Sequence, residues 1–453
     1  MDILINSINI ENFKCIEDSG EIAIRPITLI MGPNSSGKSS IIKPLLLIKQ
    51  TADSRDMEQS VRSEGTYVSL GSFNDYIYAH ENNRHFKLSF SITPDRTMGW
   101  RVSRGSTDFS RFKRFEKPNI NVFCSFRRGT QDQTISEGIV YTYFSAFGEI
   151  QVAKFRKTKG AYSGLVSRKE DEGFVKFSPK RKSKFYDVTQ SPRITTYTSY
   201  TRSEISMNMR TILDYLTRQF EIMASNIYYI GPIREEPSIL YSGAIERPQD
   251  VGISGEDAAS VLWVERSVSK KATISRKVEY WLNEFQISKD ITFKKLGPFF
   301  QLLLTDWHMG IKANLTEVGF GASQLLPVIV EGYYSPENSL IIAEQPEIHL
   351  HPKAQTLLAD LFIDVANQNK KMLIETHSEH LLTRIQRRIA ENVINNNDVA
   401  LYYCEPTTEG TRIINININE FGQLGEGLPV GFFEDGFTES KEHLHAMMKK
   451  KGK

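Results

Sequence analysis

Four residues, Gly32, Gly37, Lys38 and Ser39, have the types and spacing of a phosphate-binding loop, Gly-x-x-x-x-Gly-Lys-Ser. The glycines let the backbone turn tightly, so that successive N–H groups face phosphate oxygens. Lys38 would bring its charge to the β- and γ-phosphates, and the Ser39 hydroxyl would ligate Mg²⁺. The other loop residues expected at the nucleotide are Pro33, Asn34, Ser35, Ser36 and Ser40. The sequence therefore predicts a site for ATP and Mg²⁺.

The segments that flank this loop have the character that such a site requires. Residues 27–31 are an apolar run with β-branched members, and residues 40–48 have helical character. A Gly/Ser-rich turn that happens to contain Lys-Ser is the alternative, and the strand–loop–helix context argues against it. Pro44 lies within the predicted helix and is expected to kink or shorten it.

Two further strands are predicted to end in polar residues. Residues 339–343 are apolar and end at Glu344, an arrangement that holds Mg²⁺ or its water shell. Residues 371–374 lead to Glu375, Thr376 and His377, and a histidine at a strand end reaches the γ-phosphate as a switch.

A helix start and a histidine pair complete the candidate residues. Residues 318–324 form a Gly-rich helix N-terminus with a free Ser hydroxyl, where Gly321 and Ser323 make a second anion-binding element. His349 and His351 lie near Glu347, but a His-x-His beside proline is a weak metal signal.

Composition limits the class of protein. The chain has 453 residues, 40% hydrophobic and 24% charged, as in ordinary globular proteins. Cys15, Cys124 and Cys404 lie far apart, which gives neither a disulfide framework nor a zinc site and fits a reducing cytoplasm. No run of about 18 uncharged apolar residues occurs, so we expect no membrane span.

Charge is unevenly distributed along the chain. The net charge is +2, yet residues 101–200 hold 20 Lys/Arg against 9 Asp/Glu, an excess of +11. The basic clusters alternate with aromatic residues and β-rich runs, which indicates an inserted β-rich lobe. Such a lobe suits DNA or RNA through phosphate contacts and base stacking. A docking surface for an acidic protein and a solvated sheet face remain the alternatives.

The motifs GPNSSGKSS, VGFGASQLLPVI, AEQPEIHLHP and ETHSEHLL together resemble ABC-class ATPases of the RecF/SMC and overcoming-lysogenisation-defect (OLD) type. The chain is most similar to those of bacterial phage-defence operons, over residues 1–90 and 203–436, including YIGPIR at 229–234. The resemblance implies an α/β fold, an ABC-type head with a mixed central sheet split by the β-rich lobe. It also implies a head-to-head homodimer or larger oligomer, with ATP between Lys38 and Ser39 of one subunit and Gly321 and Ser323 of the other. Glu344 then matches the Walker B acid, and His377 the switch histidine.

The chain departs from the family pattern in two ways. Gln345 stands where ABC-class enzymes place the catalytic glutamate, and an amide orients water but cannot accept its proton. Either Glu347 substitutes, or turnover is slow and ATP acts as a bound signal. Only about 35 residues follow Ile418, too few for the C-terminal nuclease domain of OLD nucleases.

We therefore expect four segments and a regulatory role. They are the N-terminal part of the head (1–94), the basic lobe (95–202), the C-terminal part of the head (203–436) and a Lys-rich tail (437–453). The resemblance implies a cytoplasmic anti-phage sensor that controls a separately encoded effector nuclease of the HNH (Septu-like) or topoisomerase–primase type. A RecF-like repair or chromosome-maintenance clamp without a toxic effector is the alternative. A self-sufficient nuclease and a transporter ATPase are disfavoured.

Overall fold

The central element of the fold is a mixed β-sheet with the phosphate-binding loop at one edge. The computed structural model describes residues 3–54, 61–94, 119–145, 148–158, 161–168, 171–177, 216–269 and 271–425. In these residues the sheet has six strands in the order β11-β16-β17-β4-β18-β19. They are β11 (Ile227–Ile230), β16 (Leu340–Glu344), β17 (Lys371–Glu375), β4 (Ile27–Met31), β18 (Val399–Thr407) and β19 (Gly410–Asn415). All neighbouring pairs are parallel except β18 and β19, which confirms the predicted α/β fold with a mixed central sheet.

The inner strands are apolar because both faces of the sheet are covered. All five residues of β4 and of β16 are buried. Successive side chains enter different cores: Ile30 packs into one apolar cluster, and Leu29 and Met31 pack into the other. The central sheet is therefore the wall between two hydrophobic cores.

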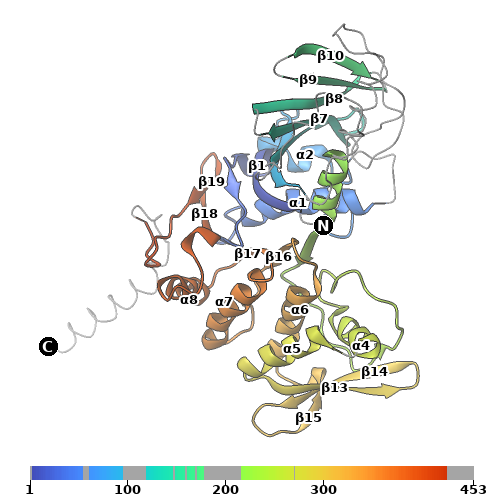
Figure 1. Cartoon of the computed structure of the whole chain (residues 1–453), viewed down its shortest axis with the longest axis vertical. Coiled ribbons are helices and arrows are strands. Elements are labelled where there is room, and N and C mark those ends of the chain that lie inside the picture. Colours follow the sequence, from blue (N-terminus) through green and yellow to red (C-terminus); the bar gives the residue numbers. More distant parts are fainter. Residues whose placement is uncertain are drawn as a thin grey trace, which may run out of the picture.

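The first core lies between the central sheet, helix α1 and a large antiparallel sheet (Figure 1). Helix α1 (Lys38–Asp53) runs through Pro44 and is not shortened there. The antiparallel sheet has the order β10-β9-β8-β7-β6-β5-β1-β2 within the described residues, and β3 pairs with β1. Its strands are β1 (Leu4–Phe13), β2 (Ile16–Asp18), β3 (Ile22–Ala23), β5 (Phe86–Thr93), β6 (Asn119–Arg128), β7 (Thr134–Ser145), β8 (Gly148–Thr158), β9 (Ala161–Arg168) and β10 (Asp171–Phe177). Strand β5 alternates buried and half-buried residues, as expected for one covered face.

The predicted β-rich insertion corresponds in part to this sheet. Strands β6 to β10 continue the sheet outward from β5. The described part of the insertion is therefore joined to the N-terminal strands by backbone pairing. The separate lobe stays a prediction. Its basic clusters at 111–115 and 180–184 lie outside the described residues.

The second core lies on the other face of the central sheet, under five helices. They are α4 (Ala258–Val268), α5 (Thr273–Glu284), α6 (Phe320–Tyr334), α7 (Pro352–Ala366) and α8 (Glu379–Ala390). A small sheet of β12 (Tyr241–Ser242), β13 (Ser288–Leu296), β14 (Phe299–Asp306) and β15 (Lys312–Asn314) adjoins them. The short elements are α2 (Phe73–Tyr76), η1 (Tyr78–His80), η3 (Leu315–Glu317) and η4 (Asn396–Asp398), and residues 216–225 are also helical.

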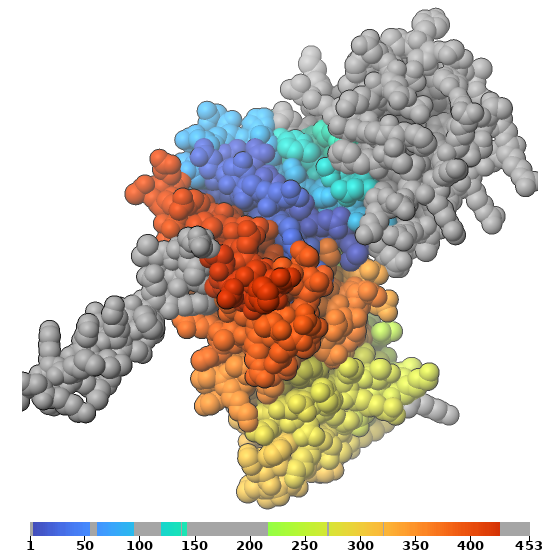
Figure 2. All heavy atoms as spheres, turned by 60° about the vertical axis from the view of Figure 1, so that its left-hand side comes forward, coloured from blue at the N-terminus to red at the C-terminus, as the bar shows by residue number. Residues whose placement is uncertain are grey.

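Segments from the two ends of the sequence lie side by side in one body. Strand β18 pairs with β4, and β19 contacts β2. Figure 2 shows this arrangement, with the blue N-terminal strands against the red segment that follows α8. The yellow part, with α4, α5 and β13–β15, lies at the opposite end from the light-blue residues near 61–94 (Figure 2). The phosphate-binding loop therefore lies beside residues from late in the sequence, and the hydroxyl of Thr411 donates a 2.9 Å hydrogen bond to the carbonyl oxygen of Ser36.

Candidate functional site

The phosphate-binding loop has a conformation that requires both of its glycines. Gly32 has φ 147°, and an added Cβ there would lie 2.5 Å from the carbonyl oxygen of Cys404. Gly37 has φ 89° and caps α1, and its added Cβ would lie 2.5 Å from Cys15 Sγ and from Thr411 Oγ1. Neither position accepts a side chain without movement of its neighbours. The central residues of the loop, Pro33 to Ser35, are exposed.

The ammonium group of Lys38 lies on the loop that precedes it. Its Nζ donates hydrogen bonds of 3.1 Å to the carbonyl oxygen of Gly32 and 2.8 Å to that of Pro33. Lys38 is buried, and loss of water contact lowers the pKa of its ammonium. A buried cation on this loop suits an anionic ligand such as a phosphate group.

Two carboxylates meet the loop at the ends of neighbouring strands. Glu344 ends β16 and Glu375 ends β17, and the two residues are paired in register. The hydroxyl of Ser39 donates a 3.0 Å hydrogen bond to Oε2 of Glu375. The hydroxyl of Tyr229, on β11, donates a 2.7 Å hydrogen bond to Oε1 of Glu344. Because the carboxyl ends of parallel strands share one edge, residues far apart in the sequence converge here.

These two acids are poised to attract a cation. Burial, and then the charge of Glu344, raises the pKa of Glu375 to about 7. Burial also raises the pKa of Glu344, although hydrogen bonding by Tyr229 opposes the shift. Buried carboxylates that repel each other beside a serine hydroxyl form a set of oxygen donors that Mg²⁺ favours. The donor set therefore fits Mg²⁺, with Ser39 and Glu344 as the predicted ligands.

The turn after β16 carries Gln345 and Glu347, the residues predicted to act on ATP. Gln345 has φ 45°, and its N–H donates 2.7 Å to the carbonyl oxygen of Glu375. The left-handed backbone at this position turns the chain back over the sheet edge. Glu347 is 7% exposed, and burial raises the pKa of its carboxyl. Its Oε1 accepts a 2.7 Å hydrogen bond from the backbone N–H of His377.

The side chain of His377 is exposed, in contrast to the acids around it. Partial burial and then the charge of Lys38 lower the pKa of its imidazole. The ring is therefore neutral at pH 7 and lies within electrostatic reach of the lysine that would bind phosphate. Its role as a switch stays a prediction.

Arg234 adds a buried cation to the site. It is 6% exposed, and its Nη1 donates 3.1 Å hydrogen bonds to the carbonyl oxygens of Glu344 and Pro232. Burial lowers the pKa of the guanidinium to about 10, so the group stays charged at neutral pH. In the described part of the chain, its Nε and Nη2 and the Oε2 of Glu347 have no hydrogen-bond partner.

The start of α6 lies close to the turn after β16. A Cβ added to Gly321 would lie 3.3 Å from Leu350 and 3.5 Å from the carbonyl oxygen of His349. Ser323 is 5% exposed and lines a small pocket with Tyr241. Ser323 is therefore buried in the single chain, and its role as an anion-binding residue stays a prediction.

The histidines after Glu347 do not gather around a metal. His351 caps α7, where its Nδ1 accepts a 3.3 Å hydrogen bond from the N–H of Lys353. His349 is exposed on a left-handed turn. Across the described ranges, no group of three or more His, Cys, Asp or Glu side chains is arranged to hold a metal ion.

Most of the chain matches one family model. The model is that of the AAA ATPase domain, and it matches residues 4–229 and 257–382. The chain belongs to this family. An AAA ATPase domain binds ATP, which agrees with the loop and the acidic strand ends described above. Among curated proteins, no match was found.

Several solved structures are similar to this AAA ATPase domain. One is an SMC head bound to the C-winged helix domain of ScpA (11% identity, 92% of this chain and 98% of that chain, TM-score 0.45). Another is the SMC head domain from Thermotoga maritima (10%, 91% and 98%, TM-score 0.37). A third is an Smc head with an extended coiled coil bound to the C-terminal domain of ScpA, derived from Pyrococcus furiosus (11%, 92% and 96%, TM-score 0.43). Likenesses of this size say nothing about activity.

The structure of this AAA ATPase domain adds three residues to the site that the motifs did not assign. Tyr229 and Arg234 belong to YIGPIR, and Glu375 begins ETHS. Their sequence signal is weak but real, since each lies at or just after the end of an apolar strand. Only the strand order shows that β11 and β17 flank β16 and bring these residues to Glu344.

No helix in the described part of this AAA ATPase domain is long and apolar enough to cross a lipid bilayer.

Proposed function

We propose that this AAA ATPase domain holds ATP with Mg²⁺ as a conformational signal and hydrolyses it slowly. The observation that carries the proposal is Gln345, an amide beside the strand-end acid Glu344. An amide orients water but does not take its proton. Glu347, two residues further along, is the carboxylate proposed as the base, and its Oε1 accepts a hydrogen bond from the backbone N–H of His377.

The residues of the site divide the work of binding. The loop from Gly32 to Lys38 surrounds the phosphates, and Ser39 with Glu344 holds Mg²⁺, which neutralises phosphate charge. Oε2 of Glu347 is the oxygen left to accept a proton from water. The raised pKa of Glu347 favours this proton transfer once the carboxyl is ionised. His377 contacts the γ-phosphate, so the position of the loop after β17 depends on whether that phosphate is present.

Two copies would enclose the nucleotide, with Gly321 and Ser323 of one copy facing the loop of the other. The resemblance of the motifs to dimeric ABC-class ATPases supports this arrangement. Exposed apolar side chains in the loop after β11 also support it, since Ile233 is 83% and Ile239 is 60% exposed. Residues 235–238 of this loop line the pocket that contains Ser323. Dimerisation would move the covering loop and open Ser323.

The cellular role follows from the resemblance alone. It would be that of a cytoplasmic sensor in an anti-phage system, controlling a separately encoded effector nuclease of the HNH or topoisomerase–primase type. The trigger would be DNA, RNA or a phage protein that binds the basic lobe. A nuclease gene beside this one, and a complex of the two products that requires ATP, would support the role.

The decisive experiment measures ATP affinity beside ATP turnover on the full chain with Mg²⁺, with and without DNA. Micromolar binding with turnover far below one per second supports an ATP-held switch. Turnover of many per second would contradict slow hydrolysis and describe a cycling motor.

A RecF-like clamp that binds DNA without a toxic effector is the second candidate. The excess of 20 Lys/Arg over 9 Asp/Glu in residues 101–200 favours it. ATP-dependent loading on gapped DNA, with affinity that falls steeply with salt, would support the clamp. Replacement of Lys180, Arg181, Lys182 and Lys184 by alanine should then flatten the salt dependence. Unchanged binding would favour a protein partner.

A further inference from the structure

We propose that Glu375 is a ligand of the nucleotide-bound divalent cation, together with Ser39 and Glu344. The inference rests on the ATP and Mg²⁺ binding proposed above and assigns a new residue to that site. Glu375 is the last residue of β17 and the first residue of ETHS, and the predicted switch histidine, His377, follows it.

The position of β17 makes this assignment possible. The strand lies between the loop strand β4 and the acid strand β16, so its end faces both. Glu375 is paired in register with Ile30 on one side and with Glu344 on the other. Its Oε2 accepts the 3.0 Å hydrogen bond from the hydroxyl of Ser39, the predicted cation ligand. Glu375 is therefore already in contact with one ligand and adjacent to the second.

The buried carboxylates of Glu375 and Glu344 favour a positive charge beside them. Glu375 is 4% exposed and Glu344 is 7% exposed, so both carboxylates are largely removed from water and their charges repel each other. A third buried carboxylate, Glu347, adds repulsion and presents an unpartnered Oε2. A divalent cation relieves the repulsion, and two carboxylates with a hydroxyl and phosphate oxygens form a suitable Mg²⁺ shell.

The cation would bind together with the nucleotide. The described residues provide no complete metal cage of their own, so phosphate oxygens and water must complete the shell. The expected property is strong coupling: Mg²⁺ should increase ATP affinity, and Glu375 should carry a large share of that increase. The competing view is that Glu375 only accepts the hydrogen bond of Ser39 while ATP is absent. Its negative charge would then repel the phosphates when ATP binds.

The test compares the wild-type chain with Glu375→Gln, which keeps an acceptor for Ser39 and removes the charge. A fluorescent ATP analogue is titrated with Mg²⁺ and with EDTA, and binding of Mn²⁺ in the presence of the analogue is followed by electron paramagnetic resonance. We expect the Mg²⁺-dependent gain in ATP affinity to fall at least about tenfold. Affinity in EDTA should stay the same or increase, because one negative charge has been removed.

An unchanged or larger Mg²⁺-dependent gain in the variant would overturn the inference and support the competing view. Glu331→Gln is the matched control, because Glu331 is also a buried carboxylate but lies on α6 and accepts from Val251 N–H. Its Mg²⁺ dependence should equal that of the wild type. If Glu375→Gln does not fold, Glu375→Asp tests the same point through a shortened reach, with the same expected loss. A wild-type chain that binds no ATP would contradict the proposed function, whereas a failure confined to Glu375→Gln contradicts only this inference.

Discussion

Glu347 and His377 join two loops of the candidate site: Oε1 of Glu347 accepts a 2.7 Å hydrogen bond from the backbone N–H of His377. One loop follows β16 and leads into α7, and the other follows β17 and leads into α8. A group that pulls on His377 therefore also moves Glu347. If His377 contacts the γ-phosphate as predicted, this hydrogen bond links that contact to both α7 and α8.

Removal of the Lys38 charge should strongly weaken ATP binding. We expect Lys38→Ala to weaken ATP affinity roughly 100-fold, since a charge-assisted contact contributes about 3 kcal/mol. Calorimetric or fluorescence titration checks this, and thermal melting shows whether the variant is folded. Lys87→Ala, on strand β5, is the control and should bind ATP as the wild type does. Intact affinity in Lys38→Ala would refute the assignment of the loop.

Glu347 is predicted to be the base for whatever turnover occurs. Glu347→Gln should lower kcat at least about 100-fold, while ATP affinity changes little. The amide keeps an acceptor for the N–H of His377, so the loop geometry is retained. Single-turnover kinetics measure the effect.

The matched variant for this prediction is Gln345→Glu, which returns a carboxylate to the position after Glu344. It should raise kcat. Equal turnover in the wild type and in Glu347→Gln would place the base elsewhere.

Arg234 should tune the protonation of Glu347. Burial is the main cause that raises the pKa of Glu347, and the positive charge of Arg234 partly opposes it. Arg234→Met removes this opposition, so the pKa of Glu347 rises and the base ionises only at higher pH. We expect the acid limb of the pH–rate profile to move to higher pH. An unchanged acid limb would show that Arg234 does not affect the pKa of the base. Arg412→Met, at an exposed pair with Glu405, should leave the profile unchanged.

Glu331 should make the stability of the fold depend on pH. Burial raises its pKa from the ordinary 4.5 to about 7, opposed by Val251 N–H, Lys370 and Lys49 and reinforced by Asp250. The native state then binds the proton more tightly than the unfolded chain, so the free energy of unfolding falls as pH rises from about 4.5 to about 7. Glu331→Gln should remove roughly 3 kcal/mol of this fall.

Chemical unfolding at pH 5 and pH 8 measures the effect of Glu331→Gln. The wild type should lose stability between these values, and the variant should lose less. Glu409→Gln, in an exposed turn, is the control and should behave as the wild type. Equal losses in Glu331→Gln and the wild type would show that Glu331 stays ionised in the fold.

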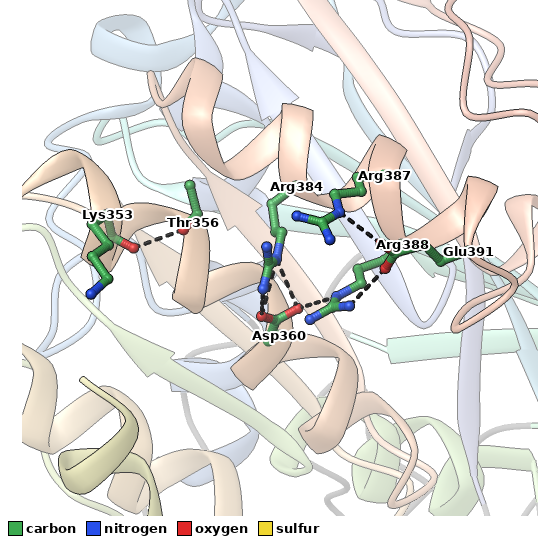
Figure 3. A network of polar contacts seen from close by, with 7 residues as sticks. All are labelled: Lys353, Thr356, Asp360, Arg384, Arg387, Arg388 and Glu391. Carbon is green, nitrogen blue, oxygen red and sulfur yellow. Dashed lines mark hydrogen bonds and ion pairs between the residues drawn. The ribbon is translucent and has the colours of Figure 1, made fainter. Parts of the chain in front are cut away.

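Asp360 joins α7 to α8 through two arginines (Figure 3). Its Oδ2 lies 2.6 Å from Nη2 of Arg384, and its Oδ1 lies 2.6 Å from Nε of Arg388. Asp360 is only 15% exposed, so Asp360→Asn removes the charge partner of the partly buried Arg384 and one of the two partners of Arg388, which keeps Glu391. We expect a loss of about 1–3 kcal/mol in the free energy of unfolding. Glu391→Gln, at the more exposed pairs with Arg387 and Arg388, should cost less. Equal losses would contradict the importance of the Asp360 pairs.

The sequence by itself determined the local features of this protein. The loop from Gly32 to Ser39 has its glycines where the backbone requires them, and the apolar runs before Glu344 and Glu375 form buried strands. Such features depend on residues that are neighbours in the chain, so spacing and residue type reveal them. The sequence alone also shows Gln345 at the position where the ABC-class pattern has its catalytic glutamate.

Tertiary structure decided which of these features meet. The contact of Glu375 with Ser39 depends on β17 lying between β4 and β16, and that order is set by the packing of both sheet faces. The burial of Arg234 and of Ser323 is likewise visible only in the folded chain. Strand order and side-chain burial are properties of long-range packing, which residue patterns along the chain do not encode.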